Sequence, residues 1–283
     1  MAELWDDLIS CLDLGEVVED GASEGTASGS GALEGTAFEG KNLPLAYHRI
    51  FGGQLLAQFA IAAVRTCPGK TVKSLHAQFP REGTADEPVR YEVAKHSDGR
   101  TFASRTILAR QSKGVIATAS VALHAAEEGR ALQTVAPVRE VPADSELVEM
   151  GMMPFETRTS VDLDAREVAV PEYSLWWRTP STDPGLAQAL AAYATDLTLI
   201  GTALRAVDGV SQADAQKAFM SAVTSHTIWF HRPFSTDAWL LLRQQGPILA
   251  HGRGFGRGDI LTADGTLVAS YAQESLVRFK AQP

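Results

Sequence analysis

The chain has 283 residues, and 45% of them are hydrophobic, so it can bury the core of one large domain or two moderate ones. Its 25 basic and 34 acidic residues give a net charge of -9, which argues against a general affinity for nucleic acid or anionic membranes. The two cysteines lie far apart without metal-ligand spacing, so we expect neither a disulfide framework nor a zinc site. An acidic N-terminus and the lack of about 18 consecutive apolar residues argue against a secretory signal or membrane insertion, and a cytoplasmic protein is the expectation.

The first half of the chain is predicted to hold a long helix followed by an antiparallel sheet. Leucines near helical spacing over residues 3–14 predict a short helix that Gly15 would end. A tract rich in Gly, Ser, Thr and Glu at 21–40 predicts a flexible insertion. The run FGGQLLAQFAIAAVRT at 51–66 predicts a mostly buried helix. Stretches rich in β-branched and aromatic residues predict the strands that follow, at 71–79, 89–96, 101–111 and 115–124.

The second half shows the same order of elements. A strand-like stretch at 173–179 precedes residues 186–204, where apolar residues at spacings of three and four predict a helix. Asp264-Gly265 is a strong hairpin signal between the last two predicted strands. The strands expected after the helix lie at 227–234, 239–243, 248–259 and 267–278.

The two halves are related by an internal repeat. Residues 74–81 align with 225–232 at an offset of 151, and a Ser, a Phe and an Arg match in place. The pattern Gly-Arg-x-Phe recurs at 99–102 and 252–255, at an offset of 153. The shared order favours duplication of a helix-then-sheet unit. We therefore predict an N-terminal domain at 1–135, a linker rich in charge and proline at 136–153 and a C-terminal domain at 154–283.

Several segments resemble one known family. They are HRIFGGQLLAQ at 48–58, SLHAQFPREG at 74–83, YATDLTLIGTAL at 193–204, HTIWFHRPF at 226–234 and DGTLVASYAQESLVR at 264–278. Together they resemble the type II acyl-CoA thioesterases over roughly residues 43–278. The resemblance implies an α+β protein of tandem hot-dog repeats, each an antiparallel sheet wrapped around a long helix. It also implies hydrolysis of fatty acyl-CoA to free fatty acid and CoA, without a metal or an organic cofactor.

The resemblance also implies catalytic residues. Members of the family hold the attacking water with an Asp, a Gln and a hydroxyl residue, and the matching positions for the first two are Asp196 and Gln273. The hydroxyl position is occupied by Val223. Thr224 and Ser225 are its neighbours, and strand alternation predicts that Ser225 shares the face of Val223 while Thr224 faces the other way.

The residue types suit thioester hydrolysis. Asp196 lies among apolar residues, so desolvation should raise its pKa and make it the general base. Gln273 carries both an acceptor and a donor and can orient the same water. Gly52 and Gly53 open a predicted helix, so their N–H groups could bind the substrate oxyanion. Gln54 is a candidate repeat counterpart of Asp196 and a third candidate for substrate binding.

Other functions remain open in the sequence. One is an acyl-CoA-binding protein that lost activity with the hydroxyl at position 223, and another is hydration of an enoyl-CoA, for which no His-Asp pair is visible. The glycines at 252–258 precede a strand rather than a helix, which argues against a dinucleotide site, and no G-x-S-x-G motif occurs. His226 and His231 flank a Trp-Phe pair without a third ligand nearby, which favours packed histidines over a metal site. An exposed sheet edge would suit a homo-oligomer.

Overall fold

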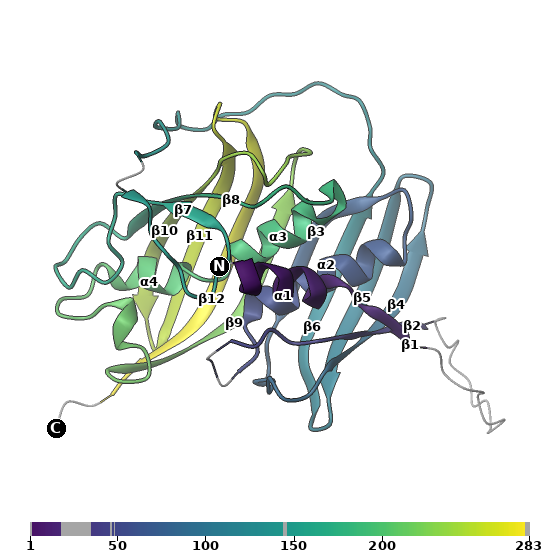
Figure 1. Ribbon diagram of the computed structural model, residues 1–283, viewed down its shortest axis with the longest axis horizontal. Helices are drawn as coiled ribbons and strands as arrows, with labels where there is room; N and C mark the ends of the chain where they lie inside the picture. The colour runs from purple at the N-terminus through teal and green to yellow at the C-terminus, as the bar shows by residue number, and fades with distance from the viewer. Residues whose placement is uncertain (1, 18–34, 46, 48, 144–145, 281–283) are drawn as a thin grey trace.

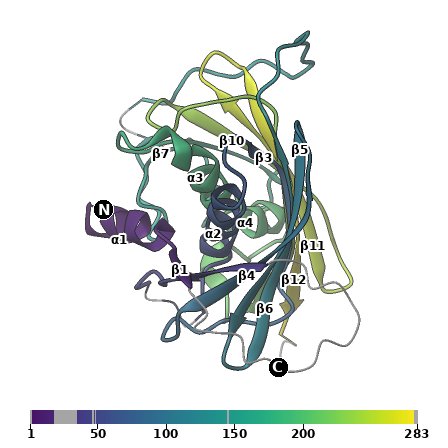
Figure 2. The ribbon, with the colours of Figure 1, turned by 90° about the vertical axis from the view of Figure 1, so that its right-hand side faces the viewer.

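The structure is a computed structural model that describes residues 2–17, 35–45, 47, 49–143 and 146–280. Within those residues, one antiparallel sheet of 12 strands curves around the helices α2, α3 and α4 (Figures 1 and 2). Figure 2 shows α1 on the side of these helices that faces away from the sheet. None of the described helices has the length and hydropathy needed to cross a lipid bilayer.

The elements of the two halves follow one another in a similar order. The first half contains α1 (Ala2–Leu12), β1 (Gly15–Val17), β2 (Gly35–Gly40), α2 (Gly52–Arg65), β3 (Thr71–Gln78), β4 (Val89–Asp98), β5 (Phe102–Gln111) and β6 (Gly114–His124). The second half contains β7 (Glu156–Arg158), β8 (Glu172–Arg178), η2 (Pro184–Leu186), α3 (Ala187–Ala194), α4 (Leu199–Leu204), η3 (Gln212–Asp214), β9 (Phe219–Phe230), β10 (Leu240–Ala250), β11 (Arg253–Thr262) and β12 (Leu267–Phe279).

The strand order reads as two equivalent half-sheets joined at the centre. It runs β1-β2-β4-β5-β6-β3 and then β9-β12-β11-β10-β8-β7, with β3 and β9 antiparallel at the junction. His76 pairs with Thr227, which is its own counterpart at the offset of 151 found in the sequence. Counted outward from the junction, the two half-sheets have equivalent orders, β3-β6-β5-β4-β2-β1 and β9-β12-β11-β10-β8-β7. The equivalent strand orders support the internal repeat, while the exact domain boundaries stay a prediction.

The core lies between the sheet and the central helices. Helix α2 is buried along most of its length, including the large side chains of Leu55, Leu56 and Phe59. It packs against α3 from the other half of the chain, which is rich in alanine and also almost wholly buried. Small side chains on α3 let the two helices approach closely at the centre of the molecule, and this contact positions the site described below.

Some predicted elements differ from the structure. The helix expected at 186–204 is two helices, because the hydroxyl of Thr195 donates to the Ala192 carbonyl oxygen and so competes with the helical pattern. The strand expected from residue 227 begins at Phe219. The strand expected at 248–259 is divided by a tight turn at His251-Gly252, where both residues have positive φ.

The glycine-rich tract at 21–40 was predicted as a flexible insertion. Residues 35–40 instead form β2, which pairs with β1 and β4. Here backbone pairing with an existing strand outweighs the low strand propensity of a glycine-containing segment. The rest of the tract, up to residue 34, lies outside the described residues.

Candidate active site

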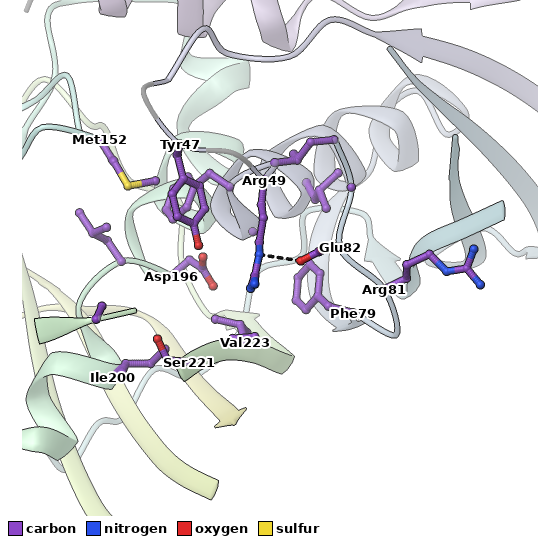
Figure 3. Close-up of a pocket in the computed structure, with 18 of the residues that line it drawn as sticks. Tyr47, Arg49, Phe79, Arg81, Glu82, Met152, Asp196, Ile200, Ser221 and Val223 are labelled. Atoms are coloured by element: carbon purple, nitrogen blue, oxygen red, sulfur yellow. Dashed lines mark ion pairs between the residues drawn. The ribbon is translucent and has the colours of Figure 1, made fainter. Parts of the chain in front are cut away.

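A cavity of about 460 Å³ opens where the two halves meet (Figure 3). Its walls come from the N-terminus of α2, the loop at 79–83 after β3, the stretch from Asp196 to Ile200 and the start of β9. Most of the lining is apolar and includes Ile50, Leu55, Phe79, Met152, Leu197, Ile200, Phe219 and Val223. A mainly apolar cavity with few polar groups is typical of a small-molecule site.

Asp196 is the acidic group at the inner wall of this cavity. It sits in the break between α3 and α4 and is only 5% exposed. The backbone N–H of Gly53, at the start of α2, donates to its Oδ2 over 3.1 Å. Within the described residues, its Oδ1 has no hydrogen-bond partner. Burial raises the pKa of Asp196 to about 7, against the smaller opposing effect of the Gly53 hydrogen bond, so this carboxylate can accept a proton near neutral pH.

Two glycines allow α2 to reach this carboxylate. A Cβ on Gly52 would lie 2.8 Å from Asp196 Oδ2, and a Cβ on Gly53 would lie 2.5 Å from the Tyr193 carbonyl oxygen. At Gly53 the clash is with backbone, so that position requires glycine, whereas at Gly52 a side chain would force the Asp196 carboxylate to move. The Gly-Gly pair thus brings the N-terminus of a helix from one half against the acid of the other half.

Gln273 and Asp196 lie near one buried histidine, His226. His226 on β9 and Gln273 on β12 are a cross-strand pair with both side chains buried. His226 Nδ1 is 3.0 Å from Gln273 Oε1 and 3.9 Å from Asp196 Oδ1. Burial lowers the pKa of His226 to about 4, so the imidazole is neutral at physiological pH. Asp196 and Gln273 therefore face the same nitrogen, Nδ1, of one neutral ring.

A β-bulge decides where the candidate hydroxyl residues lie. On β9, Ser225 pairs with Glu274 and Val223 pairs with the next residue, Ser275, so Thr224 is an extra residue. Cross-strand partners share a face. Val223 thus lies on the inner face with buried Ser275, and Ser225 lies on the outer face with Glu274. The expectation that Ser225 and Val223 share a face is wrong, because the bulge interrupts the alternation.

The bulge also explains which of these residues reach the cavity. Among the described lining residues are Val223 and Ser221, but neither Thr224 nor Ser225. The Thr224 hydroxyl instead donates to the Glu274 carbonyl oxygen over 3.0 Å. Catalytic roles for Thr224 and Ser225 gain no support from this arrangement. Figure 3 shows Val223 and Ser221, both from β9, below Asp196 in the same cavity.

The residues predicted to bind substrate at the start of α2 divide into two groups. Gly52 lines the cavity, whereas the Gly53 N–H is already taken by Asp196 and so does not serve an oxyanion. Gln54 is 1% exposed, and its side chain bonds to Asn42, Leu43 and Gln58 within the first half. Its predicted role in substrate binding is not supported, because these bonds hold it inside the N-terminal half.

Several cavity residues were not predicted from the sequence. Arg49 and Glu82 form an ion pair of 2.7 Å at the wall formed by the first half, as Figure 3 shows. Tyr47 and Met152 also line the cavity. They come from irregular segments far apart in the chain, where periodicity and motif spacing carry no signal. The described residues contain no group of three or more His, Cys, Asp or Glu side chains that could hold a metal ion.

The architecture defines a class of protein: paired half-sheets wrapped around central helices make a double hot-dog fold. A hot-dog protein from Alicyclobacillus acidocaldarius has the same fold, with a TM-score of 0.71 over 97% of this chain and 98% of its own, at 17% identity. Residues 43–124 match the family described as the acyl-CoA thioesterase N-terminal domain, and residues 126–277 match the acyl-CoA thioesterase C-terminal domain. The chain therefore belongs to the acyl-CoA thioesterase family, a family of thioester hydrolases, which confirms the resemblance seen in its motifs.

Individual relatives agree with this assignment. The chain is 29% identical to acyl-CoA thioesterase 2 of Haemophilus influenzae over 274 residues, covering 87% of this chain and 94% of the relative. A crystal structure of an acyl-CoA thioesterase II from Mycobacterium marinum superposes with a TM-score of 0.76 at 29% identity. That superposition covers 98% of this chain and 99% of the other.

Proposed function

We propose that this protein hydrolyses fatty acyl-CoA to free fatty acid and CoA by direct attack of a water held by Asp196 and Gln273. The observation that carries the proposal is the buried Asp196 carboxylate at the cavity wall, with one oxygen fixed by Gly53 and a pKa raised to about 7. The apolar lining suits an acyl chain. Family membership supports the substrate class.

The proposed reaction needs no covalent intermediate. Asp196 takes a proton from the water while the water oxygen bonds to the thioester carbonyl carbon. The resulting tetrahedral species expels CoA as a thiolate, and the proton held by Asp196 returns to that sulfur or to solvent. The reaction consumes one water molecule for each thioester cleaved.

Thiol release from a panel of acyl-CoA chain lengths tests this proposal. The expected result is steady release of CoA, with no acyl-enzyme of increased mass during turnover. An accumulated acyl-enzyme seen by intact mass spectrometry would rule out direct water attack. A protein that binds acyl-CoA but releases no thiol would instead support the second candidate function.

The second candidate is a catalytically impaired acyl-CoA-binding protein. It is favoured by one observation: the cavity wall at the expected hydroxyl position is the aliphatic side chain of Val223. The same cavity would then bind the acyl chain without completing hydrolysis.

Val223→Thr should raise kcat by about tenfold or more, because it adds a hydroxyl at the position where the resemblance implies a group that holds the attacking water. Val223→Ala is the matched control, since it changes the side chain without adding a hydroxyl. Both variants should be compared in thiol release at saturating acyl-CoA. Equal rates for Val223→Thr and Val223→Ala would show that the missing hydroxyl does not limit this enzyme.

Gly52→Ala should lower kcat by about ten- to hundredfold with little change in melting temperature. Its Cβ would lie 2.8 Å from Asp196 Oδ2 and would push the carboxylate out of position, and small displacements of a base are costly to catalysis. Gly53→Ala is the contrast, because its Cβ meets the Tyr193 carbonyl oxygen and the Phe51 ring. That variant should lose about 1–3 kcal/mol of stability by overpacking. Thermal denaturation and thiol release on both variants separate the two effects.

A further inference from the structure

A buried chain of polar groups leads from α3 to the proposed catalytic residues. The Thr195 hydroxyl lies 3.0 Å from His226 Nε2, on the side of the ring opposite Gln273. Thr195 and His226 are both fully buried, and Gln273 is 2% exposed. The His226 ring also stacks on Tyr271, with an interplanar angle of 11° and 6.0 Å between centroids. Its orientation is therefore fixed, and the position of its proton governs how Gln273 is bonded.

The proton on the histidine can be placed by counting donors. The Thr195 hydroxyl has a single proton, and it donates to the Ala192 carbonyl oxygen over 2.9 Å. The Thr195 oxygen must then accept a hydrogen bond from His226, which places the imidazole proton on Nε2. The ring is neutral, as its burial requires, so Nδ1 carries a lone pair and accepts.

An accepting Nδ1 decides the orientation of the Gln273 amide. Two acceptors 3.0 Å apart would repel, whereas the amide nitrogen of Gln273 would donate to Nδ1 at that distance. Rotating the amide by 180° exchanges its oxygen and nitrogen without moving any other group. The same rotation gives a partner to Gln273 Nε2, which among the described residues otherwise has none.

The opposite tautomer is less favourable. With the proton on Nδ1, the Thr195 hydroxyl would have to donate to Nε2, and the Ala192 carbonyl would lose that hydrogen bond. Gln273 Nε2 would also stay without a partner in this buried region. Each buried polar group left unpaired costs about 1–3 kcal/mol, so the two losses together disfavour this arrangement.

We infer that His226 is a positioning residue that fixes Gln273 as a hydrogen-bond acceptor toward the attacking water. This inference rests on the proposed function. With the Gln273 nitrogen held by Nδ1, Gln273 Oε1 is left as an acceptor, and Asp196 Oδ1, 3.9 Å from the same Nδ1, is a second acceptor without a hydrogen-bond partner among the described residues. A water that donates one proton to each keeps a lone pair on its oxygen for attack on the thioester. A donating Gln273 would instead occupy one of the two lone pairs of the water oxygen and leave one of its protons without an acceptor.

The tautomer can be measured without any turnover. Long-range correlation of the ring nitrogens with the ring C–H protons by NMR, at pH 8, separates a protonated from an unprotonated nitrogen. The chain has seven histidines, so the His226 signals are assigned by their loss in His226→Asn. The expected result is a protonated Nε2 and an unprotonated Nδ1. A protonated Nδ1 would overturn the inference even if hydrolysis is normal.

Two matched variants test the consequence for catalysis. In His226→Asn, the amide oxygen can take the place of the Nδ1 acceptor. In His226→Gln, the longer side chain places its amide near Thr195 and leaves no acceptor at the Nδ1 position. We expect His226→Asn to keep kcat within about tenfold of wild type, and His226→Gln to lose about a hundredfold with little change in KM, as a misoriented group does. Thermal denaturation of both variants is the control. If the loss of kcat in the two variants correlates with the loss of melting temperature and not with the loss of the acceptor at the Nδ1 position, His226 has only a structural role.

The outcomes also distinguish this inference from the proposed function. A wild-type protein with protonated Nε2 but no thiol release would contradict the proposed hydrolysis and leave the hydrogen-bond chain intact. Normal thiol release with equal kcat in His226→Asn and His226→Gln would keep the hydrolysis and overturn the role of His226.

Discussion

Asp196→Asn should lower kcat for acyl-CoA hydrolysis by about 10²- to 10⁴-fold, the usual contribution of a general base. The amide keeps the size of the carboxylate and can still accept from the Gly53 N–H, but it cannot take a proton from water. Acyl-CoA binding should be nearly unchanged, because the apolar cavity wall is intact. The measurements are thiol release and direct binding of a non-hydrolysable acyl-CoA analogue. A variant that keeps more than a tenth of wild-type kcat would show that Asp196 is not the base.

The pH dependence of the wild-type rate is part of the same prediction. Asp196 is active as the carboxylate, and its pKa is about 7, so kcat should rise about tenfold per pH unit below that value and level off near pH 8. The surrounding titratable groups are few: His226 is neutral in this range, and Tyr193 has a pKa raised further by burial. A rate that is flat between pH 5 and 8 would contradict a base with this pKa.

Asp196→Asn should also stabilise the fold by about 4 kcal/mol at pH 8. The Asp196 pKa is about 7 in the native state against an ordinary value of 3.8, and each pH unit of that difference is worth about 1.4 kcal/mol. Between these values the native state binds more protons than the unfolded state, so the free energy of unfolding of the wild type falls as pH rises. The Asn variant has no carboxylate at position 196, so its free energy of unfolding does not fall with pH for this reason.

Chemical denaturation of both proteins across pH measures this difference. The advantage of Asp196→Asn should shrink to about 1 kcal/mol at pH 4.5, because the wild-type carboxyl is then protonated in the native state. Other titrating groups are common to both chains and cancel in the comparison. A stability difference that stays constant with pH would mean that burial does not raise the Asp196 pKa. The combined result, an inactive protein that is more stable, is expected where a functional site holds a costly buried charge.

Much of the fold could be read from the sequence, because it depends on local patterns. The buried helix at 51–66 follows from its apolar run, and α2 spans nearly those residues. At the centre of the sheet, His76 lies opposite Thr227, its counterpart at the repeat offset of 151. Asp196 and Gln273 could be named only through resemblance to a family, since a lone acid or amide carries no local signal of its role.

Only the tertiary structure decided how those residues are arranged. Ser225 faces outward beside the inward His226, and the bulge at Thr224 brings Val223 to the cavity face, which strand alternation could not foresee because it assumes regular pairing. Asp196 acquires its pKa from burial and from Gly53, a residue 143 positions away in the chain. The sequence around His226 favours a packed histidine, yet the place of this ring between Thr195 and Gln273 depends on which strands pair. Local residue patterns thus determined the elements and the repeat, while contacts between distant segments decided the chemistry of the site.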